Sequence, residues 1–278
     1  MSPATRLRPL ALAAAIIAAA TFAAPGPAAA ATGQPGVIAV IGDFGSGAPA
    51  EGEVARMIAR LRPGTVVTTG DNVYASAGYA ALVGAYYRPW VTAQRLFPAT
   101  GNHDYAEGIS NFDTYFTWLK GRRTYTTTVG DITFFVLDSQ AALDSPTELA
   151  RQRTWLKSAL KTSGARWRVV VLHHPPYSSG TVHGSTRAFQ WPYGSWGADL
   201  VLAGHEHNYE RLVEAGLTYV VDGAGGKDLY RLGSPLLGST ARDDVHYGAL
   251  VLRPSRTTLR GEFRTASGRV VDRFTLHR

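Results

Sequence analysis

The chain has 278 residues, of which 45% are hydrophobic and 18% are charged, and its formal net charge is +7. This composition is globular, and the length suits one large domain or two small ones. The sequence contains no cysteine, which excludes disulfides, thiolate metal sites and cysteine nucleophiles. The arginines are scattered and form no run, so a nucleic-acid partner is not indicated.

The first 31 residues are typical of a secretory signal peptide. Arg6 and Arg8 form a basic start, residues 10–22 are nearly all Ala, Leu and Ile, and residues 25–31 are Pro and small residues. The alternative is a membrane anchor, but the apolar run is shorter than the roughly 20 residues that span a bilayer. We therefore expect cleavage near Ala31 and a secreted or periplasmic mature chain without a stable membrane anchor.

Taken in chain order, the hydrophobic pattern predicts alternating strands and helices first, and mainly strands later. Strands are expected at residues 37–41, 65–69, 97–100, 124–129, 132–137, 167–172, 200–203, 217–221, 249–252, 257–263 and 270–276. Helices are expected at residues 51–61, 80–87 and 147–160. This order predicts the α/β class, with two packed β-sheets flanked by helices. Because no repeat and no linker interrupts it, we expect one domain over residues 32–278.

Polar side chains follow five of the expected strands, each just past the end of a hydrophobic run. They are Asp43, Asp71, the pair Asn102 and His103, the pair His173 and His174, and the pair His205 and His207. In α/β sheets this edge is where ligands bind. Asp, Asn and His without Cys favour hard or borderline metal ions bound through oxygen and nitrogen. Each motif alone is an ordinary turn sequence, so the prediction of a site depends on the ordered set.

The spacing of the two histidines in "GHEH" suits two neighbouring ions. His205 and His207 are two residues apart, and Asp71 is a carboxylate that could bridge the ions. Two metal ions about 3.5–4 Å apart form a clamp for in-line attack on phosphorus, with a bound hydroxide as the nucleophile. The pattern therefore indicates phosphate ester chemistry.

Five sequence blocks resemble those of the calcineurin-like metallophosphoesterases, and more closely those of the purple acid phosphatases. They are residues 42–43, 70–74, 101–104, 170–173 and 204–207, and the resemblance extends over about residues 37 to 211. It implies a metallophosphoesterase-like αββα sandwich. It also implies an acid phosphatase-like hydrolase that acts on phosphate monoesters by attack of a metal-bound hydroxide.

One position departs from most of that superfamily. Most members begin Asp-x-His, with the histidine as a ligand of the first metal, whereas here Asp43 is followed by Phe44 and Gly45. Purple acid phosphatases lack that histidine too, and supply a tyrosine three residues after the bridging aspartate, where this chain has Tyr74. A phenol keeps its proton to about pH 10, so a strongly charged cation such as Fe(III) is needed to ionise it. The alternative is a core tyrosine beside a zinc or manganese site.

The resemblance implies a ligand set for two metal ions. Fe(III) is expected at the first site, with Asp43, Asp71, Tyr74 and His207 as ligands. Fe(II), zinc or manganese is expected at the second, with Asp71, Asn102, His173 and His205. His174 is the alternative to His173, which is favoured because an aromatic residue, Tyr177, follows four positions later.

The resemblance also implies two histidines that act on the substrate. His103 is expected to contact the substrate phosphate or to stabilise the leaving group. His183 is expected to face the substrate, and its alternative is an exposed loop histidine. The expected partner is a small phosphate ester. The rival functions are a phosphodiesterase on the same fold and a non-catalytic metal- or phosphate-binding protein, while the oligomeric state is left open.

Overall fold

The computed structural model describes residues 33–74 and 76–278, and the expected signal peptide over residues 1–31 lies outside that range. Among the described residues, no helix combines the length and the apolar character that crossing a bilayer requires.

The strands of the described chain form two sheets. Their bounds are β1 Gln34–Ile41, β2 Pro63–Thr68, β3 Leu96–Pro98, β4 Tyr125–Val129, β5 Ile132–Val136, β6 Trp167–Val171, β7 Leu200–Ala203, β8 Tyr209–Glu214, β9 Leu217–Asp222, β10 Ser239–Asp243, β11 Gly248–Pro254, β12 Thr258–Thr265 and β13 Val270–His277. One sheet has the order β13-β12-β11-β1-β2-β3, and the other has the order β10-β8-β9-β7-β6-β5-β4.

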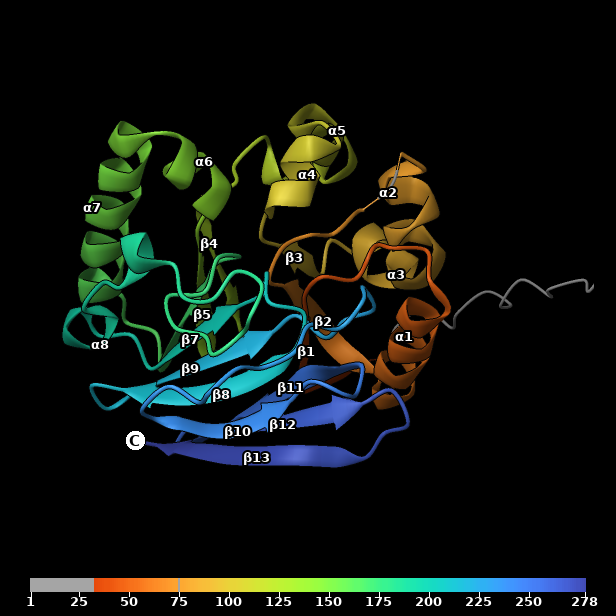
Figure 1. Ribbon diagram of the computed structural model, residues 1–278. Coiled ribbons are helices and arrows are strands. Elements are labelled where there is room, and N and C mark those ends of the chain that lie inside the picture. Colours follow the sequence, from red (N-terminus) through yellow and green to blue (C-terminus); the bar gives the residue numbers. More distant parts are fainter. Residues whose placement is uncertain (1–32, 75) are drawn as a thin grey trace, which may run out of the picture.

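The helices lie outside the two sheets. Their bounds are α1 Pro49–Leu61, α2 Gly78–Ala81, α3 Val83–Thr92, α4 Asn102–Ala106, α5 Ile109–Tyr115, α6 Ser139–Asp144, α7 Pro146–Thr162 and α8 Tyr193–Trp196, with 3₁₀ turns at Thr117–Leu119 and Arg187–Phe189. Helices α1 to α3 flank the six-stranded sheet and α6 to α8 flank the seven-stranded sheet (Figure 1).

Each sheet has a parallel centre. Strands β1, β2 and β3 run parallel, and so do β5, β6, β7 and β9. The edges are antiparallel, with β11 to β13 on one sheet and β4, β8 and β10 on the other. Because the carboxyl ends of parallel strands share one edge in each sheet, the loops after β1, β2 and β3 lie together, and so do those after β6 and β7. Contacts between the two sets of loops bring them into a common site.

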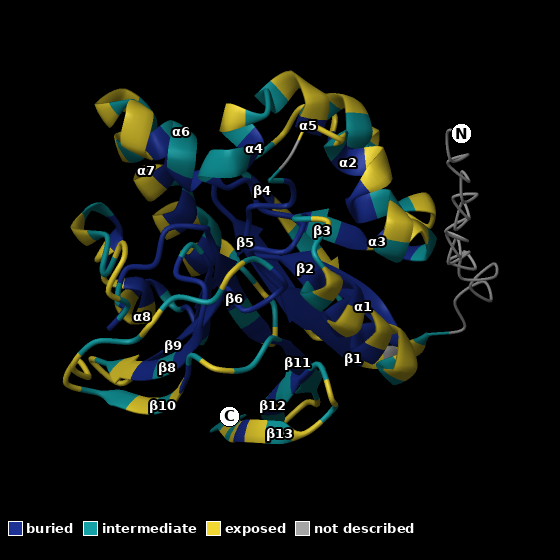
Figure 2. Cartoon of the chain, turned by 45° about the vertical axis from the view of Figure 1, so that its right-hand side comes forward, coloured by how far each residue is buried: buried dark blue, intermediate teal, exposed yellow. Residues whose placement is uncertain are grey.

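The structure has four layers, which are helices, sheet, sheet and helices. The alternation of side chains along the central strands explains why each sheet is covered on both faces. In β6, Val169 and Val171 belong to the core between the sheets, whereas Val170 belongs to the core under α6 to α8. In β5, Phe134 faces the first core and Phe135 the second. Successive strand residues point to opposite faces, so a run that is apolar throughout must be covered on both sides. Figure 2 shows the buried strands in the interior and the exposed residues on the helices and the outer strands.

Local signals set where the longer helices begin. Helix α7 begins with Pro146 after Ser145, whose hydroxyl accepts the N–H of Glu148 at 3.3 Å. Helix α1 begins with Pro49 and buries Val54 and Ile58 on one face.

The expected α/β architecture with two sheets is confirmed, but one local expectation was wrong. The helix predicted over residues 80–87 is divided at Leu82 into α2 and α3. Gly78 and Gly84 favour helix weakly, so packing sets the geometry there. The "GNHD" block, which alone is typical of a turn, forms the start of helix α4 at Asn102. Strands β8 and β10 were not expected, because the charged residues of β8 hide its pattern.

Candidate metal centre

Two carboxylates lie buried at the ends of neighbouring parallel strands. Asp43 follows β1 with its side chain 0% exposed, and Asp71 follows β2 and is 1% exposed. Both have left-handed backbone, with φ of 57° and 50°, and so does His205 after β7, with φ of 72°. This conformation is costly for residues other than glycine and is concentrated at functional sites. Three chemically active side chains are thus held by strained turns at the strand ends of the two sheets.

Glycines beside these carboxylates allow the close approach. A Cβ added at Gly101 would lie 2.1 Å from Oδ1 of Asp71, and one at Gly204 would lie 2.5 Å from Oδ2 of Asp43. Any side chain at either position would displace a carboxylate. The glycines in the "GNHD" and "GHEH" blocks therefore serve the site directly.

Asp43, Tyr74 and His207 form one group of contacts. The phenolic oxygen of Tyr74 lies 3.1 Å from Oδ1 of Asp43 and 3.0 Å from Nε2 of His207. Nε2 of His207 lies 3.4 Å from Oδ1 of Asp43. Ligand atoms of Asp43, Asp71 and His207 all lie within 4.8 Å of one another, a spacing that suits a shared metal ion.

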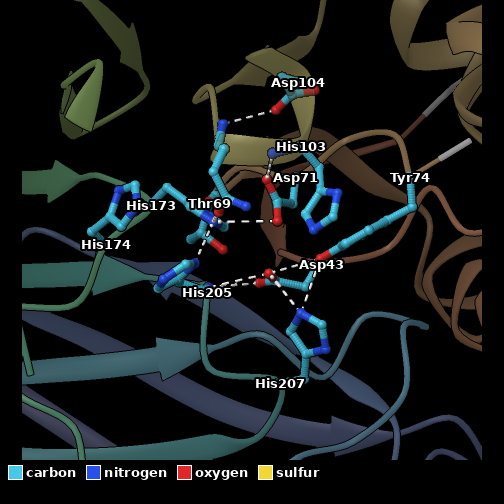
Figure 3. A network of polar contacts seen from close by, with 12 residues as sticks. Asp43, Thr69, Asp71, Tyr74, His103, Asp104, His173, His174, His205 and His207 are labelled. Carbon is cyan, nitrogen blue, oxygen red and sulfur yellow. Dashed lines mark hydrogen bonds and ion pairs between the residues drawn. The ribbon is translucent and has the colours of Figure 1, made fainter. Parts of the chain in front are cut away.

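A second group surrounds the imidazole of His173. Its Nε2 lies 3.0 Å from Oδ1 of Asn102, 3.4 Å from Oδ2 of Asp71 and 3.1 Å from Nδ1 of His205. These residues come from the loops after β2, β3, β6 and β7. In Figure 3, Asp71 lies near the centre, His173 and His205 lie to its left, and Asp43 and His207 lie below it.

Backbone carbonyls orient two of the imidazoles. Nδ1 of His173 donates to the carbonyl of Thr69 at 2.9 Å, and Nδ1 of His207 donates to the carbonyl of Asp228 at 2.8 Å. A proton held on Nδ1 directs Nε2 into the site, where it can bind a metal ion once any proton on Nε2 is displaced. This is the usual way in which a protein fixes a histidine for metal binding.

Burial and neighbouring charges shift the pKa values of His173 and His205 in opposite directions. Burial lowers the pKa of His173, but the carboxylate of Asp71 outweighs it and the pKa rises to about 9. Burial and the neighbouring His173 lower the pKa of His205. Nε2 of His173 and Nδ1 of His205 are 3.1 Å apart, so the two imidazoles cannot both be in the protonated, cationic form. The cluster therefore keeps at least one imidazole neutral, which is the form that binds metal.

The phenol of Tyr74 is held in its neutral form by its surroundings. Burial raises its pKa well above the usual 10, and the charges of Asp43 and Asp71 raise it further. A phenolate at this position therefore requires a strongly charged cation beside it.

The neighbouring histidines 173 and 174 point to different places. His174 is buried, and its Nδ1 lies 2.8 Å from the hydroxyl of Ser139. Burial, together with the nearby His173, lowers the pKa of His174 to about 3. The structure thus brings His173, and not His174, into contact with Asn102 and Asp71.

The two predicted substrate histidines lie at the edge of the groups. The ring centroid of His103 lies 4.3 Å from that of Tyr74, and its backbone N–H donates to Oδ1 of Asp71 at 2.8 Å. His183 is exposed and stacks on His205 with centroids 3.9 Å apart. Both imidazoles are placed where a group bound between Asp71 and His205 can contact them.

Sequence reasoning missed two buried carboxylates that support the site. Asp104 accepts hydrogen bonds from Nδ2 of Asn72 at 2.9 Å, from the N–H of Gly101 at 2.8 Å and from the hydroxyl of Tyr79 at 2.7 Å. Burial raises the pKa of Asp104 to about 7, and the charge of Asp71 adds to the shift. Asp104 belongs to the "GNHD" block, and its place next to the candidate ligands in the sequence is the signal that could have identified it.

Glu206 is the second of these carboxylates. It is fully buried within "GHEH", and its Oε1 accepts the backbone N–H groups of His183 and Gly184. It therefore fixes the loop that carries His183.

The donor set fits metal ions. It consists of convergent carboxylates, imidazoles, an amide oxygen and a phenol, and it includes buried carboxylates whose charges favour a nearby cation. Asp43, Asp71 and His207 form the tightest candidate group.

Comparison with known proteins agrees with this geometry. The family model described as calcineurin-like phosphoesterase matches residues 36–209. An uncharacterised protein of Mycobacterium tuberculosis is 27% identical over 206 residues, which cover 59% of this chain and 38% of that protein. Purple acid phosphatase 15 of Arabidopsis thaliana is 35% identical over 118 residues, which cover 37% of this chain and 22% of that protein. The chain therefore spans well under half the length of these relatives.

Solved structures share the fold. GAP50, the anchor in the inner membrane complex of Plasmodium, superposes with a TM-score of 0.72 at 19% identity, covering 87% of this chain and 88% of that one. Purple acid phosphatase PPD1 from yellow lupin seeds gives a TM-score of 0.69 at 21% identity, covering 87% of this chain and 53% of that one.

The resemblance to metallophosphoesterases and to purple acid phosphatases is thus confirmed by sequence and by fold. With the matched model spanning more than half of its residues, this chain belongs to the calcineurin-like phosphoesterase family, a superfamily of hydrolases.

Proposed function

We propose that this protein is an exported binuclear metallophosphatase that hydrolyses phosphate monoesters, as an acid phosphatase does. The observation that carries the proposal is the position of Asp71. Its Oδ2 lies 3.4 Å from Nε2 of His173, while its carboxylate also lies within 4.8 Å of the ligand atoms of Asp43 and His207. A carboxylate shared by two groups of donors suits a pair of metal ions.

The first ion would be held by Asp43, Asp71, Tyr74 and His207, and the second by Asp71, Asn102, His173 and His205. When bound, such ions supply Lewis-acid polarisation of the phosphoryl oxygens and lower the pKa of water. We propose Fe(III) at the Tyr74 site, because burial and two carboxylates disfavour the phenolate unless a highly charged ion is present. Fe(II), zinc or manganese would occupy the second site.

The remaining residues bind and orient the substrate. The backbone N–H of His103 donates to Asp71, and its imidazole would contact a phosphoryl group bound beside Asp71 and would donate a proton to the leaving oxygen. His183, stacked on His205, would contact the phosphoryl oxygens from the exposed side. Glu206 holds the His183 loop in place.

Two other functions share this fold. A phosphodiesterase would use the same donors with a different pocket, and a binding protein would keep the donors without turnover. The arrangement of His103 beyond the candidate ligands favours hydrolysis over binding alone. The similarity to GAP50, whose description is that of an anchor, shows the fold and leaves the activity to experiment.

The test uses the metal-reconstituted protein with p-nitrophenyl phosphate and bis(p-nitrophenyl) phosphate. The proposal expects release of p-nitrophenol from the monoester at a higher kcat/KM than from the diester. A preference for the diester would indicate a phosphodiesterase. Binding of inorganic phosphate with no turnover of either ester would indicate a binding protein.

Export is proposed from the N-terminal sequence alone. Arg6 and Arg8 are separated by Leu7, so the paired arginines of the twin-arginine route are absent and the general secretory route is proposed. Mature protein should begin close to Ala31 or Thr32. N-terminal sequencing of secreted material tests this, and an intact Met1 in that material would refute it.

A further inference from the structure

Lys227 lies at the candidate metal centre and has no role in the proposed chemistry. Its Nζ lies 5.7 Å from the ring centroid of Tyr74, the phenol that contacts Asp43 and His207. The opposite charge nearest to it belongs to Asp228, whose Oδ2 is 3.4 Å away. Because the Asp228 side chain is 85% exposed, water screens that ion pair strongly and it contributes little.

The backbone holds Lys227 at this place. Its N–H donates to the carbonyl of Asp43 at 3.0 Å, and two residues earlier the N–H of Gly225 donates to the carbonyl of Gly42 at 3.0 Å. Further along the same segment, the N–H of Tyr230 donates to the carbonyl of His207 at 2.9 Å. The loop after β9 is therefore attached to both candidate ligand loops, which fixes the backbone of Lys227 relative to them.

Lys227 and His103 contact the same ring. The His103 centroid lies 4.3 Å from the Tyr74 centroid, so the imidazole and the ammonium group both border the phenol at the rim of the site. The Lys227 side chain is 34% exposed, which leaves its donors accessible to a ligand. A lysine ammonium is a compact point charge that binds phosphate oxygens through charge-assisted hydrogen bonds.

We propose that Lys227 forms a subsite for a second anionic group, next to the phosphoryl group that reacts. The inference rests on the proposed function, since it places the reacting phosphoryl group between Asp71 and His103. The substrate class that this favours is a phosphate ester with a second phosphate linked to the first, such as an inorganic or organic diphosphate. A substrate with a single phosphate and a neutral leaving group gains little from this lysine.

The test measures binding by calorimetry on the metal-reconstituted protein, with methylphosphonate and methylenediphosphonate as non-hydrolysable probes. Lys227→Met should raise the Kd of the diphosphonate about 10- to 100-fold, the range expected for a lost hydrogen bond to a charged group, and that of the monophosphonate less than about 3-fold. Lys227→Arg should restore most of the affinity for the diphosphonate. Lys161→Met, at the exposed end of α7, removes the same charge and should change neither constant.

Three results would overturn the subsite. They are equal weakening of both phosphonates, no weakening of either, and a loss of bound metal in Lys227→Met. In parallel, hydrolysis of p-nitrophenyl phosphate by the wild type tests the proposed function independently. If the wild type is active while Lys227→Met does not distinguish the probes, the subsite fails and the phosphatase proposal stands.

Discussion

The phenolic oxygen of Tyr74 lies 3.1 Å from Oδ1 of Asp43, and the two side chains come from loops at the ends of β1 and β2. The same oxygen lies 3.0 Å from Nε2 of His207. Three donor atoms of different chemistry thus meet at one place. Tyr74 stands there for the histidine of the Asp-x-His pattern, which this chain lacks. If Fe(III) binds there, this relationship predicts a spectroscopic signature.

The expected signature of a Tyr74 phenolate bound to Fe(III) is a visible colour. A phenolate donates charge into the half-filled d shell of Fe(III), whereas zinc has a full d shell and cannot accept it. The oxidised, iron-loaded protein should therefore be pink to purple, and Tyr74→Phe should bleach it while iron remains bound. The measurement is a visible absorption spectrum beside a metal count.

Tyr230 provides a matched control for that experiment, because its ring stacks on His207 with centroids 3.9 Å apart. Tyr230→Phe keeps the ring and should keep the colour. A colourless wild type with a full complement of ferric iron would show that Tyr74 is not coordinated, and the Fe(III)–phenolate assignment would be abandoned.

Asp71 should be needed for metal binding as well as for turnover. Its carboxylate contacts both groups of donors, so Asp71→Ala removes a ligand from each ion. We expect the variant to bind fewer than two metal ions per chain and to lose measurable activity. Metal analysis after dialysis checks this. The control is Asp131→Ala in the exposed turn between β4 and β5, and normal metal content and activity in Asp71→Ala would show that the site is assigned wrongly.

His103 should matter for turnover but not for metal binding. Its side chain contacts the Tyr74 ring, and only its backbone N–H bonds to Asp71. His103→Ala should lower kcat by about 10²- to 10⁴-fold, the range typical of a lost proton donor. Metal content should stay near that of the wild type. His277→Ala, on the exposed end of β13, is the control, and loss of metal in His103→Ala would place His103 among the ligands.

Glu51 should make the stability of the fold depend on pH. The side chain is fully buried, accepts the N–H groups of Ser46 and Gly47, and leaves Oε1 without a partner. Burial raises its pKa from 4.5 to about 7, and the two N–H groups oppose that rise. Between these values the folded protein binds more protons than the unfolded chain, so its free energy of unfolding falls as pH rises. The fall is at most about 3 kcal/mol.

Glu51→Gln isolates this contribution. The amide oxygen still accepts both N–H groups, but the side chain does not titrate. Urea unfolding at pH 5 and pH 8 should show a smaller decrease in the free energy of unfolding for Glu51→Gln than for the wild type. Identical decreases in the two proteins would mean that Glu51 is already charged in the folded state at pH 5.

The central strands were predictable because they are buried on both faces. The runs at β1, β2, β6 and β7 are mostly apolar or β-branched and buried. The polar residues that follow them mark the strand ends of the two sheets, where Asp43, Asp71, His173 and His205 meet. Strand β8 could not be recognised. Its Glu210 is fully buried, but hydroxyls of Ser179 and Ser239, distant in the sequence, bond to its carboxylate.

The contacts that support the site could not be predicted from the sequence pattern either. The carbonyl that orients His173 belongs to Thr69, and its identity depends on how two strands of different sheets approach each other. Likewise, the position of Lys227 over Tyr74 depends on hydrogen bonds between loops about 180 residues apart. Residue type and spacing indicate which groups converge, whereas tertiary packing decides which nitrogen of each imidazole faces the site.

The most direct test of the account is the rate of p-nitrophenyl phosphate hydrolysis as metal is removed and returned. We expect a chelator to abolish the activity, and the activity to return in full when two metal ions are bound per chain. Activity that survives complete metal removal, or no activity at any metal content, would contradict it.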